Sequence, residues 1–384
     1  MRSVRYVPHF ENIPILVRVA LNAPIADGKV ANTFRLLKAI PTIEFLRKEY
    51  ARVVLVGHIG DQGTESLMPV YEAMRDFVPG LKFCPVTVGP EARAAVRDLP
   101  PGGVLMLENV RRNIGETKND PAFARDLAEL ADVFVQDSFD VCHRSHASVV
   151  GIPYYLSSYA GFQVEEEVRE LTKALRPGRP SLAVIGGAKF STKQPVLEKL
   201  IASYDRVFVG GALANDFMVE RGYSVGTSLV SKDSDKEALE RLLANPKLML
   251  PLDEVVAPLG SRGDDDIPDP VVSLDQVPSK SAILDDGPQT IAALGELAAQ
   301  AKTILWNGPL GLYESGFAAA TEGFAKHVAA SKAYSIIGGG DTIAAVEKLN
   351  LSDRFSFIST GGGAMLDFIA KGTLPGLEAL EVSS

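Results

Sequence analysis

Short, continuously apolar runs recur along this chain, and they constrain its fold more than any other feature of the sequence. They occupy residues 52–58, 103–109, 132–138, 181–187, 206–212, 303–309, 334–340 and 355–363. Continuous apolar runs of this length predict strands that are buried on both faces of a sheet. Helical patterns separate them, such as the apolar stripe formed by Leu36, Ile40, Ile43 and Leu46. Strands alternating with helices predict an α/β fold with parallel sheets built from crossover connections.

The two halves of the chain differ in the residues at the ends of their apolar runs. The length of 384 residues exceeds what one hydrophobic core usually spans, so we expect two domains. Glycine pairs and triplets end the runs of the second half, whereas basic residues come after those of the first. Ligands of parallel sheets bind at the carboxyl ends of the strands. The sequence therefore predicts a basic site for an anion in the first half and a glycine-lined phosphate site in the second. The helical segment 163–180 is the candidate connection.

Charge and cysteine content exclude several classes of protein. The net charge of -9 argues against a nucleic-acid or anionic-membrane partner, because an acidic protein repels both. The apolar run near the N-terminus is interrupted by Arg18, so it does not resemble a signal peptide, and no continuous apolar stretch is long enough to span a membrane. The only cysteines are Cys84 and Cys142, without C-x-x-C spacing, which favours a reducing compartment. We expect a cytoplasmic protein.

The segment "GGAKFSTK" (186–193) lies between a predicted strand and a predicted helix. Ser191 and Gln194 have the spacing of a capping box, which predicts that the helix begins next to Lys189 and Lys193. Lysines beside a helix N-terminus favour anion binding. The segment does not have the spacing of a P-loop, so its residues alone are compatible with either a phosphate cradle or a solvated loop.

Two other segments are ambiguous when taken alone. Asp341 follows three glycines at a strand end, which suits a carboxylate that holds Mg²⁺ on a phosphate, or equally a helix N-cap. His143 and His146 form an H-x-x-H pair, but no further ligands stand nearby for zinc.

Together, these motifs resemble one family. The segments "VRVALNAPIADGKVANTFRLLKAIPTI" (17–43), "HRSHASVVGIP" (143–153), "GGAKFSTK", "LWNGPLGLYE" (305–314) and "SIIGGGDTIAAVEK" (335–348) are similar, in order, to those of phosphoglycerate kinases. The similarity runs from about residue 13 to residue 380. It implies two doubly wound, Rossmann-like lobes joined by a long helix with a hinge. The implied boundaries are 1–162 for the acceptor lobe, with 372–384 returning to it, 163–180 for the helix, and 181–371 for the nucleotide lobe.

The resemblance also implies a monomer that moves a phosphoryl group between Mg-ATP and the carboxylate of 3-phosphoglycerate after the lobes close. Because that carboxylate is already ionised at neutral pH, the reaction needs charge stabilisation and not a general base. Arg35 and Lys189 match the residues that hold the transferring group. The matching nucleotide residues are Lys193, Gly211, Asn307, Glu314, Gly339, Gly340, Asp341 and Thr342, with Asp341 also implied for Mg²⁺. The matching acceptor residues are Asn22, Arg35, His58, Arg111, His143 and Arg144.

The acceptor motifs depart from the family pattern at three places. The family's D-F-N triplet reads Ala20-Leu21-Asn22 here, and its H-L-G-R reads His58-Ile59-Gly60-Asp61. A Gly-Thr pair is replaced by Asp140-Val141. Two alternatives are open at position 61. The Asp61 side chain points away from the site, or a neighbour such as Arg112 supplies the missing positive charge. Three functions are therefore open from the sequence: this kinase with an altered acceptor site, a kinase for another carboxylate, or a nucleotide-binding protein without turnover.

Overall fold

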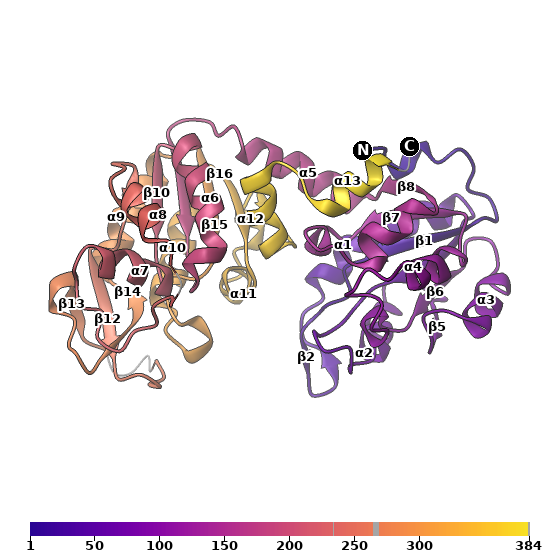
Figure 1. Ribbon diagram of the computed structural model, residues 1–384, viewed down its shortest axis with the longest axis horizontal. Helices are drawn as coiled ribbons and strands as arrows, with labels where there is room; N and C mark the ends of the chain where they lie inside the picture. Colours follow the sequence, from indigo (N-terminus) through magenta and orange to yellow (C-terminus); the bar gives the residue numbers. More distant parts are fainter. Residues whose placement is uncertain (233, 264–268, 383–384) are drawn as a thin grey trace. The chain divides into compact units, whose positions relative to one another are not determined.

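The computed structural model describes residues 1–232, 234–263 and 269–382, which form two compact units (Figure 1). The first unit comprises residues 1–169 and the C-terminal segment from Thr373, and the second comprises residues 170–372. The boundary lies within helix α5 (Phe162–Ala174), so the segment 163–180 is helical only in its first part.

The first unit is built on a parallel sheet with the strand order β5-β6-β4-β1-β7-β8. The chain adds strands on one side of β1 before it crosses to the other, so the sheet is doubly wound, with its switch point between β1 and β7. The strands are β1 (Pro14–Val19), β4 (Arg52–Val56), β5 (Lys82–Cys84), β6 (Val104–Leu107), β7 (Val133–Asp137) and β8 (Ser157–Ala160). The predicted apolar runs of this half therefore form strands.

Helices cover this sheet, and a short hairpin precedes the first of them. In α1, the side chains of Leu36, Ile43 and Leu46 are fully buried and Ile40 packs against them, as the apolar stripe predicted. The helices and hairpin strands are α1 (Phe34–Lys48), α2 (Met68–Met74), α3 (Pro90–Arg97), α4 (Pro121–Ala128), α13 (Pro375–Val382), β2 (Ile25–Ala26) and β3 (Lys29–Val30). Single turns of helix lie at Val4–Tyr6, Val110–Arg112, Phe139–Val141, Ala147–Gly151 and Ile152–Tyr154.

The C-terminal segment packs tightly against the first unit. The backbone N–H of Gly376 donates to the carbonyl oxygen of Cys142 at 2.8 Å. A Cβ atom on Gly376 would lie 2.9 Å from Val149 Cγ1, so only glycine allows this approach. The first unit is therefore completed by residues from the far end of the chain.

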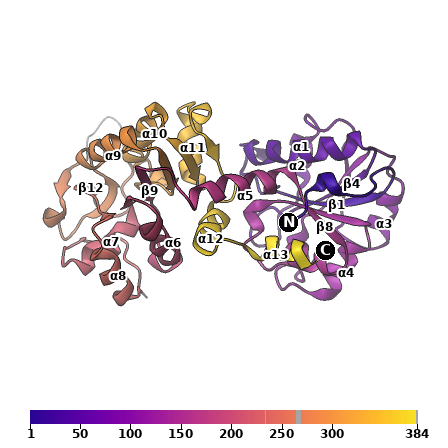
Figure 2. The ribbon, with the colours of Figure 1, turned by 90° about the horizontal axis from the view of Figure 1, so that it is seen from above.

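The second unit contains another doubly wound parallel sheet, with the order β11-β10-β9-β15-β16-β17. Its switch point lies between β9 and β15. Figure 2 shows α9, α10 and α11 on one face of this sheet and α6, α7 and α8 on the other. The strands are β9 (Ser181–Ile185), β10 (Arg206–Val209), β11 (Leu248–Met249), β15 (Thr303–Asn307), β16 (Tyr334–Gly338) and β17 (Phe357–Ile358). The helices are α6 (Phe190–Ser203), α7 (Ala212–Glu220), α8 (Lys236–Leu243), α9 (Pro288–Gln300), α10 (Ala319–Ala330), α11 (Gly340–Lys348) and α12 (Gly362–Lys371), with single turns at Leu274–Gln276, Tyr313–Ser315 and Ser352–Arg354.

The second unit also holds an antiparallel sheet that the sequence did not predict. Its order is β13-β12-β14, formed by β12 (Asp253–Ala257), β13 (Val271–Ser273) and β14 (Ala282–Asp286). Acidic residues occupy the start of β12 and the end of β14, so neither strand has the continuous apolar run of the others. All residues of β14 are nevertheless buried.

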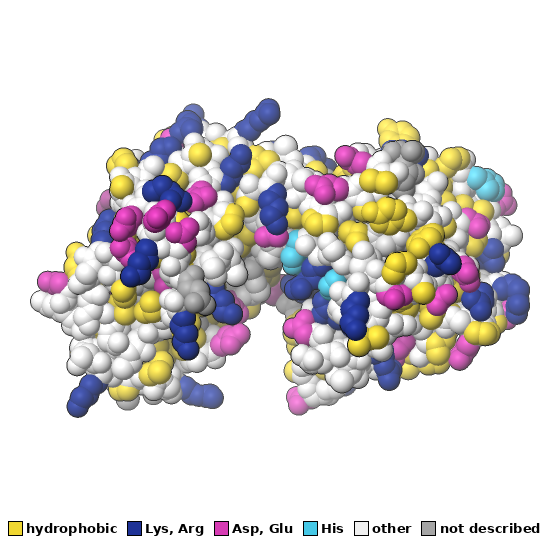
Figure 3. All heavy atoms as spheres, viewed as in Figure 1, with side chains coloured by type: hydrophobic (Ala, Val, Ile, Leu, Met, Phe, Trp, Pro, Cys, Tyr) yellow, Lys and Arg dark blue, Asp and Glu magenta, His cyan; other side chains and the backbone are white. Residues whose placement is uncertain are grey.

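The molecular surface carries both signs of charge. Lys and Arg side chains are interspersed with Asp and Glu over the face shown in Figure 3. Among the described residues, no helix is both long enough and apolar enough to cross a membrane.

Candidate active site

Basic and amide side chains gather where the strands of the first sheet end. Asn22 follows β1, His58 follows β4, Arg111 follows β6, and His143 and Arg144 follow β7. Five of the predicted acceptor residues therefore come from loops at one edge of the sheet, beside the switch point, and the sixth, Arg35, is tied to this edge through Asn22.

Hydrogen bonds join several of these loops. The carbonyl oxygen of Asn22 accepts from Arg35 Nη1 at 3.0 Å, and Asn22 Oδ1 accepts from the backbone N–H of Gly60 at 3.1 Å. Arg111 Nη1 donates to the carbonyl oxygen of Gly60 at 2.6 Å. The loops after β1, β4 and β6 thus hold one another, and Arg35 is tied to them from the first turn of α1.

A buried arginine that the sequence did not single out as a site residue fixes the orientation of His58. Arg18 on β1 is almost fully buried, and its Nη2 donates to His58 Nδ1 at 2.9 Å. Since a guanidinium only donates, His58 Nδ1 accepts, and the ring proton is on Nε2. Arg18 Nε donates to Ser148 Oγ at 3.0 Å, and Ser148 Oγ donates to Glu116 Oε1 at 2.6 Å. A charged residue inside the apolar run of β1 was the sequence signal for this network.

Burial and the positive charge of the site keep two histidines neutral. Burial, followed by the charges of Arg18 and Arg111, lowers the pKa of His58 well below its usual value. Burial, followed by the charges of Arg111 and Arg144, lowers the pKa of His146 to about 4. His146 Nδ1 lies 3.8 Å from Glu116 Oε1. The site is therefore cationic through its arginines at neutral pH.

We expect these histidines to make the protein sensitive to mild acid. Their folded pKa values lie below the unfolded value near 6.5, so the unfolded chain binds more protons between about pH 4 and 6.5. The free energy of unfolding should fall as pH decreases through this window, by on the order of 2 kcal/mol after allowance for solvent screening. Chemical denaturation at pH 7.0, 5.5 and 4.5 measures it. His146→Asn should show a shallower decrease than the parent, and an unchanged slope would contradict this account.

The three departures from the family pattern take defined positions. Asp61 Oδ1 accepts from Arg111 Nη1 at 2.8 Å, although the Asp61 side chain is 85% exposed. The expectation that Asp61 points away is thus wrong. The expectation that Arg112 replaces the missing charge is not supported, because Arg112 Nη1 donates to Glu108 Oε2 at 3.0 Å.

The other two departures are Ala20, in the core of the first unit, and Asp140, in the loop after β7. Ala20 is fully buried and presents no polar atom to the site beyond its backbone. Asp140 Oδ1 accepts from Ser138 Oγ at 2.5 Å, so its carboxylate is held within its own loop.

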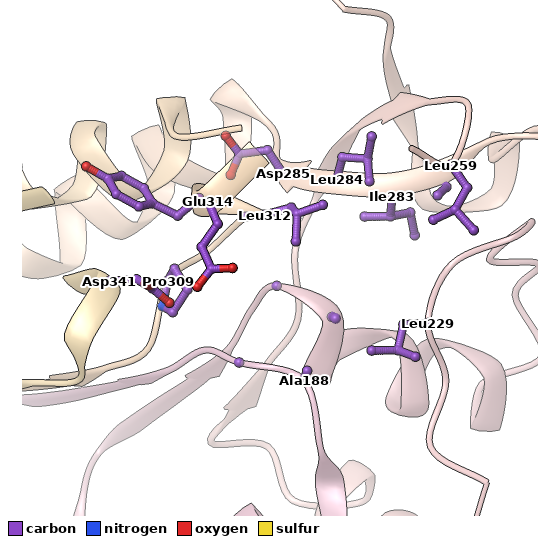
Figure 4. Close-up of a pocket in the computed structure, with 16 residues that line it drawn as sticks. Ala188, Leu229, Leu259, Ile283, Leu284, Asp285, Pro309, Leu312, Glu314 and Asp341 are labelled. Carbon is purple, nitrogen blue, oxygen red and sulfur yellow. The ribbon is translucent and has the colours of Figure 1, made fainter. Parts of the chain in front are cut away.

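A cavity of about 520 Å³ lies at the carboxyl edge of the second sheet. Figure 4 shows Glu314 and Asp341 near one another at one end and Leu229, Leu259 and Ile283 at the other. Burial, followed by the charge of Glu314, raises the pKa of Asp341. Asp285 also lines the cavity, which thus combines an apolar end with three carboxyl groups. This suits a ligand with an apolar part, hydroxyl donors and a phosphate held through a cation.

Glycines shape the loops that bound this cavity. A Cβ atom on Gly186 would lie 2.0 Å from the carbonyl oxygen of Pro309, so the loops after β9 and β15 touch at the switch point. Gly211 lines the cavity with a φ of 60°, in the left-handed region that favours glycine. Among the predicted nucleotide residues, Gly211, Glu314 and Asp341 line the cavity.

The lysine segment differs from the prediction. Helix α6 begins at Phe190 with Lys189 as N-cap and no side-chain cap, so the predicted capping box of Ser191 and Gln194 is wrong. Helix α6 starts earlier than that box requires, and Gln194 Nε2 instead donates to Glu198 Oε1 at 3.3 Å. Lys189 is exposed. Lys193 is half-buried, and its burial lowers its pKa.

The remaining predicted nucleotide residues lie beside the cavity and not in its lining. Thr342 Oγ1 accepts from the backbone N–H of Gly308 at 3.1 Å, and Asn307 Nδ2 donates to the carbonyl oxygen of Gly362 at 3.3 Å. Gly339 is the N-cap of α11, which begins at Gly340. The alternative that Asp341 is the N-cap is therefore wrong, and its carboxylate is left to face the cavity.

Two doubly wound sheets, one ending in a cluster of arginines and the other in a glycine-bounded cavity with carboxylates, are typical of an α/β phosphotransferase. The family model for phosphoglycerate kinase matches residues 7–371. The chain belongs to the phosphoglycerate kinase family.

Individual relatives agree over the whole chain. A phosphoglycerate kinase of Moorella thermoacetica is 43% identical over 382 residues, which cover 96% of each chain. A relative of the same name from Rubrobacter xylanophilus is 43% identical over 390 residues, covering 99% of this chain and 98% of its own. The solved phosphoglycerate kinase of Coxiella burnetii has a TM-score of 0.81 at 36% identity and covers 99% of this chain and 98% of its own. That of Pyrococcus horikoshii has a TM-score of 0.87 at 29% identity, with 100% and 99% covered.

Proposed function

We propose that this chain transfers a phosphoryl group between ATP and the carboxylate of 3-phosphoglycerate. The observation that carries the proposal is the presence of a cationic cluster at the edge of one doubly wound sheet and of a glycine-bounded cavity at the edge of the other. Membership of the family favours this reaction over a different acceptor and over a protein without turnover.

The nucleotide is proposed to occupy the cavity of the second unit. Its apolar end, with Leu229 and Leu259, suits a purine base, and the Glu314 carboxylate suits ribose hydroxyls as an acceptor of hydrogen bonds. Asp341, at the start of α11, suits the phosphate end. The proposed site is completed by residues behind or beside the cavity lining, which are Lys193, Asn307, Gly339, Gly340 and Thr342.

The carboxylates fit a magnesium ion held jointly with phosphates. Magnesium takes oxygen ligands and usually uses one or two carboxylates plus substrate phosphates. Asp341 meets this need. Burial and the charge of Glu314 raise its pKa, so its ionised form is unfavourable, and a bound cation would stabilise that form. The ion supplies charge neutralisation on the phosphates when bound. We propose Asp341 as its protein ligand.

The acceptor is proposed to bind at the basic edge of the first unit. Arg111, His143 and Arg144 suit its phosphate, and Asn22 and His58 suit its hydroxyl and carboxylate oxygens as hydrogen-bonding groups. His58 would donate from Nε2, because Arg18 occupies Nδ1.

Arg35 and Lys189 are proposed to act on the transferring group itself. The acceptor carboxylate is already ionised, so the chain needs to supply charge stabilisation at the equatorial oxygens and no proton transfer. These residues belong to different units, so the proposal requires a state in which both contribute.

The nucleotide assignment is tested by Glu314→Ala. We expect the Kd for Mg-ADP, measured by titration calorimetry, to rise about tenfold, because a charge-assisted hydrogen bond contributes about 1.5–3 kcal/mol. Glu240→Ala, which removes an exposed glutamate on α8, is the matched control and should bind like the parent. Equal affinities in Glu314→Ala and the control would refute the assignment.

Turnover of Mg-ATP with 3-phosphoglycerate by the purified chain tests the reaction itself. The absence of turnover despite binding of both substrates would contradict the proposal. The monomeric state and cytoplasmic location stay predictions, and sedimentation analysis tests the first.

A further inference from the structure

Two acidic side chains outside both proposed substrate sites meet in the core of the second unit. Glu254 on β12 and Asp286 on β14 stand directly opposite one another in the antiparallel pair. Opposed residues of such a pair extend to the same face, with Cβ atoms about 4.5–5.5 Å apart. The exposed fractions of the two side chains are 0% and 2%. The fold therefore places two carboxyl groups together away from water.

Most of their oxygens lack a hydrogen-bond donor. Among the described residues, Glu254 Oε1, Glu254 Oε2 and Asp286 Oδ2 have no hydrogen-bond partner, whereas Asp286 Oδ1 accepts from the backbone N–H of Gly211 at 3.2 Å. A buried ionised carboxylate without a partner is very costly. A proton held between the two groups would satisfy one oxygen of each and remove one charge.

Within the part of the chain that the structure describes, the charged groups around the pair offer no compensating cation. On the same strands, Asp253 accepts from the backbone N–H groups of Gln289 and Thr290, and Asp285 accepts from that of Ala320. From the other neighbouring elements, β13 places Val272 opposite Glu254, and α9 and α10 contribute Glu296 and His327 to a cavity of about 590 Å³ that Asp286 also lines. Burial, followed by the neighbouring carboxylates, raises the pKa of both Glu254 and Asp286.

Asp286 also packs against the turn that bounds the proposed nucleotide cavity. A Cβ atom on Gly210 would lie 2.4 Å from Asp286 Oδ2 and 2.7 Å from Phe208 Cε1. The next residue, Gly211, lines the cavity and donates to Asp286 Oδ1. The carboxyl group of Asp286 therefore supports the Gly210–Gly211 turn from behind.

We propose that Glu254 and Asp286 share one proton and act as positioning residues for the nucleotide site. Glu254 donates to Asp286 Oδ2, and Asp286 Oδ1 accepts from Gly211, which holds the turn in its binding conformation. When the proton leaves to solvent, two like charges face each other in the core and the turn moves. The affinity for nucleotide should therefore fall as pH rises. This inference rests on the proposed nucleotide site.

Calorimetric titration with Mg-ADP between pH 6.0 and 9.5 tests the proposal on the full chain. We expect the parent's Kd to rise about tenfold over this range, equivalent to about 1.4 kcal/mol. The double variant Glu254→Gln/Asp286→Asn keeps the shapes and hydrogen bonds but cannot lose the proton, so its Kd should change less than about twofold. Glu240→Gln, at an exposed position, removes one charge, as the double variant does while the pair holds its proton, and should titrate like the parent.

Identical pH profiles in the parent and in Glu254→Gln/Asp286→Asn would overturn the shared proton. Failure of the parent to bind Mg-ADP at any pH would instead overturn the proposed nucleotide site. The only tryptophan, Trp306, is buried in the second unit, so its fluorescence reports whether each variant is folded there.

A measurement on the parent alone covers the case in which the double variant does not fold. At pH 8, where free ADP is fully ionised, binding should take up a fraction of a proton. Titrations in buffers of different ionisation enthalpy measure this uptake, and its absence would also overturn the proposal.

Discussion

Arg35→Ala should lower kcat by about 10²–10³-fold while leaving the affinity for Mg-ADP unchanged. Loss of one donor that stabilises transition-state charge has an effect of this size. Arg35 belongs to the first unit, whereas the nucleotide cavity is formed by the second, so the substitution removes no residue from that cavity. Steady-state kinetics with Mg-ATP and 3-phosphoglycerate measures kcat, and calorimetry measures the nucleotide affinity.

Lys48→Ala is the matched control for this substitution. Lys48 is the last residue of the same helix, α1, and is exposed, so its removal changes the net charge equally at the opposite end of the helix. We expect kcat within about twofold of the parent. A kcat for Arg35→Ala as high as that of Lys48→Ala would remove Arg35 from the chemistry. A parallel loss of nucleotide affinity would instead indicate damage to the fold.

Asp61→Arg should lower the KM for 3-phosphoglycerate by about 10- to 100-fold with little change in kcat. The Asp61 carboxylate now accepts from Arg111 Nη1 at 2.8 Å, so an acceptor phosphate has to compete for that donor. The substitution removes the competing charge and adds a donor, and each charged hydrogen bond contributes about 1.5–3 kcal/mol. Initial rates at varied 3-phosphoglycerate measure the KM.

Asp61→Asn separates the two parts of this effect. It removes the charge without adding a cation, and because Asp61 is largely exposed we expect a smaller decrease in KM, about three- to tenfold. High salt should shrink this difference. Asp98→Asn, an exposed aspartate beside Arg97 at the end of α3, is the matched control. An unchanged KM in both Asp61 variants would show that the Asp61–Arg111 pair does not oppose the acceptor.

The parallel strands were predictable because a strand buried on both faces has a continuous run of apolar residues. The runs at 52–58 and 303–309 became β4 and β15, and their carboxyl ends bear His58 and the Asn307 loop as expected. The family resemblance then predicted which basic and glycine residues form the substrate sites. Which loops lie side by side at a switch point depends on the strand order. The sequence implies that order only through the family resemblance.

Other features depend on contacts that no local pattern encodes. The buried strands β12 and β14 carry acids in the core, against the usual rule for burial, because backbone N–H groups at the starts of α9 and α10 donate to Asp253 and Asp285. The bond from Arg18 to His58 joins β1 to the loop after β4, and α6 begins at Phe190, ahead of the expected cap. These required the tertiary structure.

The route of the chain through the two units has a consequence for its synthesis. The second unit is one continuous segment, whereas the first is completed by α13, whose Gly376 bonds to Cys142. On the ribosome, the first unit therefore cannot complete its fold until the residues of α13 emerge. Until then, the face that receives α13 stays uncovered. The part translated later can finish folding earlier, so a released chain truncated after residue 372 should hold a mature second unit and an unfinished first one.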